Sequence, residues 1–284
     1  MQPTRRDLKF QLPADRIADW HSLGPYVSHF MNTLSVFFPE GERFFIHAVR
    51  HYRGEIDDEQ LKQAVTGFIG QEAMHGREHE EYNGAVAAAG YPVKEMEARV
   101  TALLEEVKAN APKSVQLAAT IALEHFTAML ADKLLDDDAV LGGAEPHYAR
   151  LWRWHALEET EHKAVAYDVW DQVMGRGPRA YLTRVMALIT ATVVFWRLVA
   201  EFHWQMVKAD PNLPRGWRAR IKGYGSLAWY LFGQPGTLRR VVPEWLDYFR
   251  PGFHPWDHDN RHFLSQISAL EDELEQIQKL QVAA

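Results

Sequence analysis

The sequence predicts an all-α protein built on a four-helix bundle. Strand-like alternation is scarce, whereas apolar residues recur at alternating spacings of three and four along most of the 284 residues. Four of the predicted helices also carry Glu or His at positions where this periodicity calls for an apolar residue. These observations favour a bundle with a polar interior and additional helices on its C-terminal side.

The composition restricts the chemistry. The chain is 47% hydrophobic and 24% charged, as is usual for a globular protein, and its formal net charge of -7 argues against a nucleic-acid partner. It contains no cysteine, which excludes disulfides, iron–sulfur clusters and thiolate metal sites. Carboxylates and the 14 histidines remain as metal-binding groups.

The N-terminal segment only superficially resembles an export signal. Arg5-Arg6 is not followed by the apolar stretch that a twin-arginine signal requires, so we expect a cytoplasmic protein. The longest uncharged apolar run, Val185 to Trp196, is too short to span a membrane and predicts a buried helix rather than a transmembrane segment.

We expect a single domain over residues 1–284, with a lead-in (1–37), a metal-binding core (38–174) and accessory helices (175–284). Pro39 suits the first turn of a helix, so the first core helix is predicted to begin there and to end near Arg53. The other predicted core helices are 59–89, 112–135 and 145–174, and the accessory ones are 179–208, 214–232, 237–248 and 259–280.

Six ionisable residues lie on the inward faces of the four core helices. Two of these helices carry Glu-x-x-His, which places both side chains on one face about a turn apart, and each motif follows a lone Glu on the preceding helix. In each helix hairpin the two positions lie at similar distances from the turn, so all six should meet at one depth. Because buried charges are rare unless paired or metal-bound, we predict these as metal ligands: Glu42, Glu72, His75, Glu124, Glu159 and His162.

Two neighbouring carboxylates are alternatives. Glu40 could replace Glu42, and Glu158 could replace Glu159. We favour Glu42 because it shares a helix face with Phe38, and Glu159 because it reproduces the Glu-x-x-His motif. A buried Glu/His network without metal is a further alternative, but four close carboxylates would then repel one another.

Two more histidines are candidate ligands. His155 precedes Glu159 by four residues and His162 by seven, so it lies on the same helix face. His79 lies one turn beyond His75. Either could bind metal directly; His155 could instead support another ligand, and His79 could donate a proton or be an ordinary core histidine.

The order Glu, Glu-x-x-His, Glu, Glu-x-x-His resembles that of the ferritin-like di-iron carboxylate proteins. More closely, the chain is similar, from about Arg5 to Trp256, to a bacterial family of predicted metal-dependent hydrolases. The similar segments are Phe38–Glu42, Gln71–His75 with His79, Glu124–Ala128, Trp154–Lys163 and Pro251–Trp256.

The resemblance implies a centre of two iron ions, with manganese as an alternative, that activates dioxygen. The expected function is then that of an oxidase or oxygenase acting on a small organic substrate, with an external electron donor. A di-metal hydrolase and an iron-storage protein are the alternatives. A third imidazole from His155 resembles the arylamine N-oxygenases, and the amphipathic C-terminal helix leaves a homodimer open.

Overall fold

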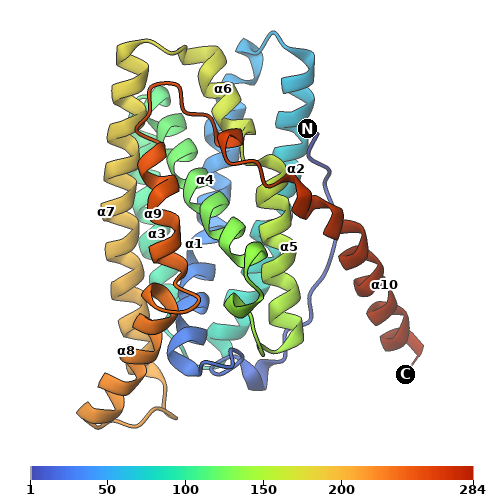
Figure 1. Ribbon diagram of the computed structural model, residues 1–284, viewed down its shortest axis with the longest axis vertical. Helices are drawn as coiled ribbons and strands as arrows, with labels where there is room; N and C mark the ends of the chain where they lie inside the picture. Colours follow the sequence, from blue (N-terminus) through green and yellow to red (C-terminus); the bar gives the residue numbers. More distant parts are fainter. Residues whose placement is uncertain (1, 284) are drawn as a thin grey trace.

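The computed structural model describes residues 2–283, and those residues form α-helices, short 3-10 helices and loops without any strand (Figure 1). The all-α prediction is confirmed. The α-helices are α1 (Pro25–Tyr52), α2 (Glu59–Ala88), α3 (Val93–Asn110), α4 (Lys113–Asp136), α5 (Pro146–His162), α6 (Val165–Met174), α7 (Pro178–Ala209), α8 (Trp217–Phe232), α9 (Thr237–Asp247) and α10 (Ile267–Ala283).

The core consists of two helix pairs that face each other. Helix α1 packs against α2, and α4 packs against α5 and α6; contacts of α1 with α4 and of α2 with α5 and α6 join the pairs. Helix α7 covers α1 and α4 and forms the left-hand margin of Figure 1, while α10 leaves the opposite side. Helices α3, α7, α8 and α9 also pack against helices of this core.

The predicted start of the first helix at Pro39 is wrong. Helix α1 begins at Pro25 and continues through Pro39, so residues 25–37 belong to the core and not to a lead-in. Proline lacks the N–H that would bond the carbonyl four residues earlier, which here is that of Ser35. The Asn83 side-chain amide of α2 donates to this Ser35 carbonyl (3.2 Å), and this tertiary contact compensates for the missing helical bond.

The predicted helix over 145–174 is also divided. Helix α5 ends at His162 and α6 starts at Val165, with a turn at Lys163 and Ala164. The Lys163 ammonium group donates to the His258 carbonyl (2.6 Å) and to the Asn260 side chain (2.7 Å), which ties this turn to the C-terminal loop. The interruption directly follows His162, a predicted metal ligand, and separates α6 from α5.

An N-terminal arm, residues 2–12, crosses the outside of α2 and α5. Two glycines of α2 make this close contact possible: a Cβ atom at Gly67 would lie 2.0 Å from the Pro3 carbonyl oxygen, and one at Gly70 would lie 3.0 Å from Arg5. The Phe10 backbone N–H donates to Glu78 of α2 (3.0 Å). These contacts hold the arm against the two helices that supply the Glu-x-x-His motifs.

Helix α7 is not the buried helix that we predicted from its apolar run. In length and composition it could cross a membrane, but only 22% of its most apolar 18-residue window is buried. Its inner side packs on α1 and α4, and its outer side exposes apolar residues such as Leu182 and Val193.

Substitution of Gly67 tests whether the arm packs on α2 at this glycine. We expect Gly67→Ala to destabilise the protein by about 1–3 kcal/mol, because the new methyl group must displace Pro3. Gly84→Ala is the matched control: it lies in the same helix with nothing within 4 Å of its Cβ position, and there Ala should stabilise by about 0.5–1 kcal/mol. Urea denaturation measures both; equal effects would contradict the proposed packing.

Candidate metal centre

The six predicted ligands come together in the interior of the core. Glu42 is on α1, Glu72 and His75 are on α2, Glu124 is on α4, and Glu159 and His162 are on α5. None of these residues is more than 3% exposed. Together with His155, which is also 3% exposed, they form three overlapping groups whose ligand atoms lie within 4.8 Å of one another. We call these seven residues the carboxylate–histidine cluster.

One half of the cluster contains Glu42, His75 and His155. The Glu42 carboxylate oxygen Oε1 lies 4.0 Å from His75 Nδ1 and 3.9 Å from His155 Nε2. Gly76 allows α1 and α2 to approach here, since a Cβ atom on it would lie 3.1 Å from Glu42 Oε2. The two nitrogens and the carboxylate therefore surround a common point.

The other half contains Glu72, Glu124 and His162. His162 Nε2 lies 3.0 Å from Glu72 Oε1 and 3.7 Å from Glu124 Oε2. Glu159 lies between the halves: its Oε1 is 2.8 Å from His155 Nε2, and its Oε2 is 3.5 Å from His162 Nε2. Such a carboxylate can bridge two ions.

The donor atoms of the cluster lack the partners that buried polar groups require. Both carboxylate oxygens of Glu42, Glu72 and Glu124 are buried without a hydrogen bond, as are His75 Nδ1 and His162 Nε2. Leaving buried polar atoms unpaired costs about 1–3 kcal/mol each, and more when they are charged. Two divalent cations would satisfy these atoms and balance the four carboxylates, so the residues fit a two-metal centre.

The pKa values reflect the same lack of partners and of positive charge in the cluster. Burial and then the neighbouring carboxylates raise the pKa of Glu42 and of Glu124 well above the usual range, and burial raises that of Glu72 to about 7. Burial also opposes charge on Glu159 and His162, but their attraction for each other lowers the pKa of Glu159 and raises that of His162. Without metal, the cluster thus holds protons where cations would otherwise compensate the charge.

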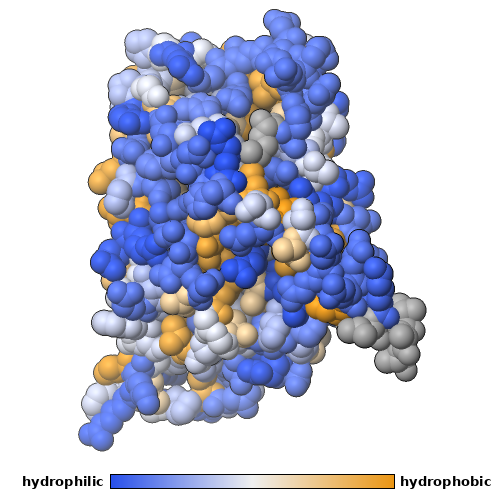
Figure 2. All heavy atoms as spheres, turned by 45° about the vertical axis from the view of Figure 1, so that its right-hand side comes forward, coloured by the Kyte–Doolittle hydropathy of each residue, from blue (hydrophilic) through white to orange (hydrophobic). Residues whose placement is uncertain are grey.

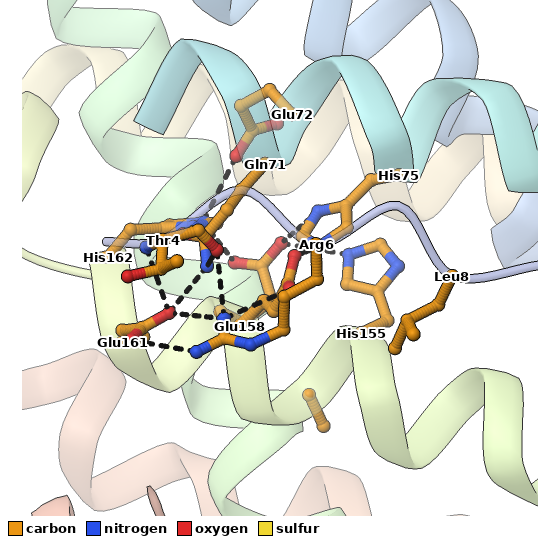
Figure 3. A network of polar contacts seen from close by, with 12 residues as sticks. Thr4, Arg6, Leu8, Gln71, Glu72, His75, His155, Glu158, Glu161 and His162 are labelled. Atoms are coloured by element: carbon orange, nitrogen blue, oxygen red, sulfur yellow. Dashed lines mark hydrogen bonds and ion pairs between the residues drawn. The ribbon is translucent and has the colours of Figure 1, made fainter. Parts of the chain in front are cut away.

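Hydrogen bonds from α5 and α2 orient the two motif histidines (Figure 3). His75 Nε2 bonds to Glu158 (3.1 Å), and Arg6 of the arm bonds to the same carboxylate (3.1 Å). His162 Nδ1 bonds to the Gln71 side-chain oxygen (2.9 Å). Each imidazole thereby presents its other nitrogen to the cluster, an arrangement typical of metal-binding histidines.

The structure places His155 and His79 differently. His155 Nε2 faces Glu42 and Glu159, whereas His79 lies outside the three groups. His79 contacts His155 Nδ1 through Nε2 (2.7 Å) and the Ser35 hydroxyl through Nδ1 (2.8 Å), and Ser35 donates to Asn83 (2.8 Å). Ser35 uses its hydroxyl proton for Asn83, so His79 Nδ1 donates to Ser35 and His155 Nδ1 donates to His79 Nε2. His155 Nε2 then keeps its lone pair, which points into the cluster.

The carboxylate alternatives are also separated in space. Glu40 is paired with Arg43 (2.8 Å) at the surface of α1, away from the cluster. Glu158 bonds to His75 from outside, while Glu159 lies within the cluster. Helix periodicity did not single out Arg6, Gln71 or Thr127, whose roles depend on contacts between distant segments. The Thr127 hydroxyl, for example, donates to Glu159 (2.5 Å).

A cavity of about 710 Å³ reaches one half of the cluster. The charged and imidazole side chains on its wall are Glu42, His155 and Glu159. The rest is mainly aliphatic and aromatic, with residues from α1, α3, α4 and α7. Glu72, Glu124 and His162 do not line it. A volume of this size accommodates an organic molecule whose apolar part lies against the wall.

The helical core and the buried cluster define a protein of the metal-dependent class. Residues 4–259 match the model of the family described as predicted metal-dependent hydrolase, and the chain belongs to this family. No curated protein and no solved structure matches it. The ferritin-like relationship therefore stays a prediction that rests on motif order and spacing.

Removal of cluster carboxylates should reduce bound metal. We expect protein purified without chelator to contain two ions per chain, and Glu72→Ala and Glu159→Ala to lose most of them, as measured by inductively coupled plasma mass spectrometry. Glu40→Ala is the matched control and should keep full occupancy, since Glu40 pairs with Arg43. Full occupancy in both cluster variants would remove the case for this centre.

Neutralising one carboxylate should have opposite effects on stability and metal binding. Burial gives Glu124 a high pKa in the folded protein, so the metal-free fold loses stability as the pH rises above about 4.5, where this group ionises in the unfolded chain. We expect Glu124→Gln to raise the free energy of unfolding of metal-free protein at pH 8, because glutamine has no charge to bury. The same variant should bind metal more weakly. A destabilised metal-free variant would contradict this account.

Proposed function

We propose that the carboxylate–histidine cluster binds two iron ions and uses dioxygen to oxidise an apolar organic substrate held in the adjacent cavity. The observation that carries the proposal is a buried set of unpartnered carboxylate and imidazole donors at the end of an apolar cavity. Bound iron would supply the oxygen chemistry, and an external donor would supply electrons.

The donor set supports iron or manganese. Glu42, Glu159, His75 and His155 would hold one ion, and Glu72, Glu124, Glu159 and His162 the other. Oxygen and imidazole ligands without thiolate suit these metals, and iron with an open coordination position reacts with dioxygen. His79 is not in this ligand set; it would hold the His155 ring in position.

The cavity supports an apolar substrate. Phe38 lies beside His155, with ring centroids 4.4 Å apart, and Phe126 and Phe195 belong to the same wall. This surface would exclude water from the reacting end, which suits oxidation of a C–H or amine group more than attack by water. Glu42 and His155 are the side chains through which substrate would approach the metals.

Hydrolysis is the second candidate, because the family description names it. Two metal ions can lower the pKa of a bound water and make it a nucleophile. An ester with a long apolar group could occupy the same cavity. The two functions differ in their need for oxygen and for a redox-active metal.

Oxygen consumption distinguishes the two functions. We expect anaerobic protein loaded with ferrous iron to consume dioxygen on mixing with oxygenated buffer, at about one molecule per pair of ions, as measured with an oxygen electrode. Zinc-loaded protein should consume none. Iron-loaded Glu40→Ala should behave like the wild type, and Glu159→Ala should show only the background rate of free iron. Sustained anaerobic hydrolysis of acyl esters by the zinc form would favour the hydrolase instead.

A further inference from the structure

Helix α8 exposes a large apolar surface. Trp217, Ile221, Trp229 and Phe232 are 67%, 65%, 61% and 58% exposed, although they are among the most hydrophobic residues of the chain. Their spacing places them within an arc of about 120° around the helix. The opposite side of α8 is buried through Leu227, Tyr230 and Leu231. Soluble proteins rarely expose so many large apolar side chains together without a partner.

Helix α7 exposes a second apolar stripe. Leu182, Met186, Ile189 and Val193 recur at spacings of four and three and are 59%, 57%, 39% and 63% exposed. Both helices lie at the left-hand margin of Figure 1, and α8 projects beyond the end of the core. The face turned toward the viewer in Figure 2, on the side of α10, is by contrast hydrophilic over most of its area.

The charge around α8 indicates what covers this surface. Residues 211–243 contain six basic residues and no acidic one, although the whole chain has a net charge of -7. Arg215, Arg218, Arg220 and Lys222 are exposed, and none of them takes part in an ion pair among residues 2–283. Arg218 and Lys222 follow Trp217 and Ile221 directly, so Arg218 lies within the apolar arc and Lys222 lies at its edge. Tryptophan beside arginine and lysine is typical of helices that lie in a membrane interface.

We infer that the exposed face of α7 and α8 docks on an anionic lipid surface. The basic residues would attract acidic headgroups, and the apolar side chains of α8 would insert below them. A second copy of the chain fits less well, because a symmetric contact through α8 would bring the basic residues of both copies together. The core stays outside the bilayer, since α7 remains packed on α1 and α4.

The cavity opens beside this face. Leu182, Met186 and Val194 of α7 both line the cavity and are exposed, and Val115 of α4 (37% exposed) lines the same opening. A docked bilayer would therefore cover the mouth, and an apolar molecule dissolved in it could reach Glu159 without crossing water. This route to substrate rests on the proposed function, whereas the docking does not.

Co-sedimentation with vesicles tests the docking without any metal or activity measurement. We expect the wild-type protein to bind vesicles of phosphatidylglycerol and phosphatidylcholine at low salt, to bind phosphatidylcholine alone weakly, and to be partly released by 0.5 M salt. Arg218→Glu/Lys222→Glu should lower the partition coefficient at least about tenfold. Arg50→Glu/Lys94→Glu is the matched control: it changes the net charge equally on exposed positions of α1 and α3, and should bind nearly as the wild type.

A second variant separates membrane docking from dimerisation. Trp217→Ser/Ile221→Ser keeps the charge and should also reduce vesicle binding, while circular dichroism and thermal melting stay unchanged because both residues are exposed. The inference is overturned if the wild-type protein ignores anionic vesicles, or if both charge variants lose binding equally. It is also overturned if light scattering shows a dimer that Trp217→Ser/Ile221→Ser converts to monomers.

Discussion

The burial of four carboxyl groups at one place in the core is the constraint on which the metal centre depends. Glu42, Glu72, Glu124 and Glu159 come from four different helices, so the cost of burying them falls on the packing of the whole core. A hydrophobic core would pack these helices more favourably without metal. The four carboxyl groups therefore lower the stability of the metal-free core, and in return they form a site where cations bind.

The segments around the core restrict how the cluster can rearrange. The arm reaches His75 through Arg6 and Glu158, and the interrupted end of α5 is fixed by Lys163. The carbonyl that Pro39 leaves free lies on Ser35, whose hydroxyl also supports His79 and, behind it, His155. Parts of the chain that look like connections in the sequence thus orient the imidazole rings.

The sequence predicted the helical class and a set of side chains that the structure also places together, because helix periodicity and Glu-x-x-His spacing are local properties. It failed where tertiary contacts override local preference. Pro39 marks a helix start in most contexts, but Asn83 satisfies the carbonyl it leaves unbonded. Arg6 carried no local signal, and the exposure of α7 could not be deduced because apolar composition is the same for a buried helix and an uncovered one.

The cavity reaches only one half of the cluster, and this restricts the order in which two metal ions could bind. Glu72, Glu124 and His162 are enclosed by α2, α4 and α5 and do not line the cavity. In the folded chain, an ion travelling through the cavity passes Glu42 and Glu159 before it can reach them. Loading would then be sequential, with the inner ion slow to exchange and the outer ion labile, so that brief treatment with a chelator would yield a half-loaded protein before an empty one.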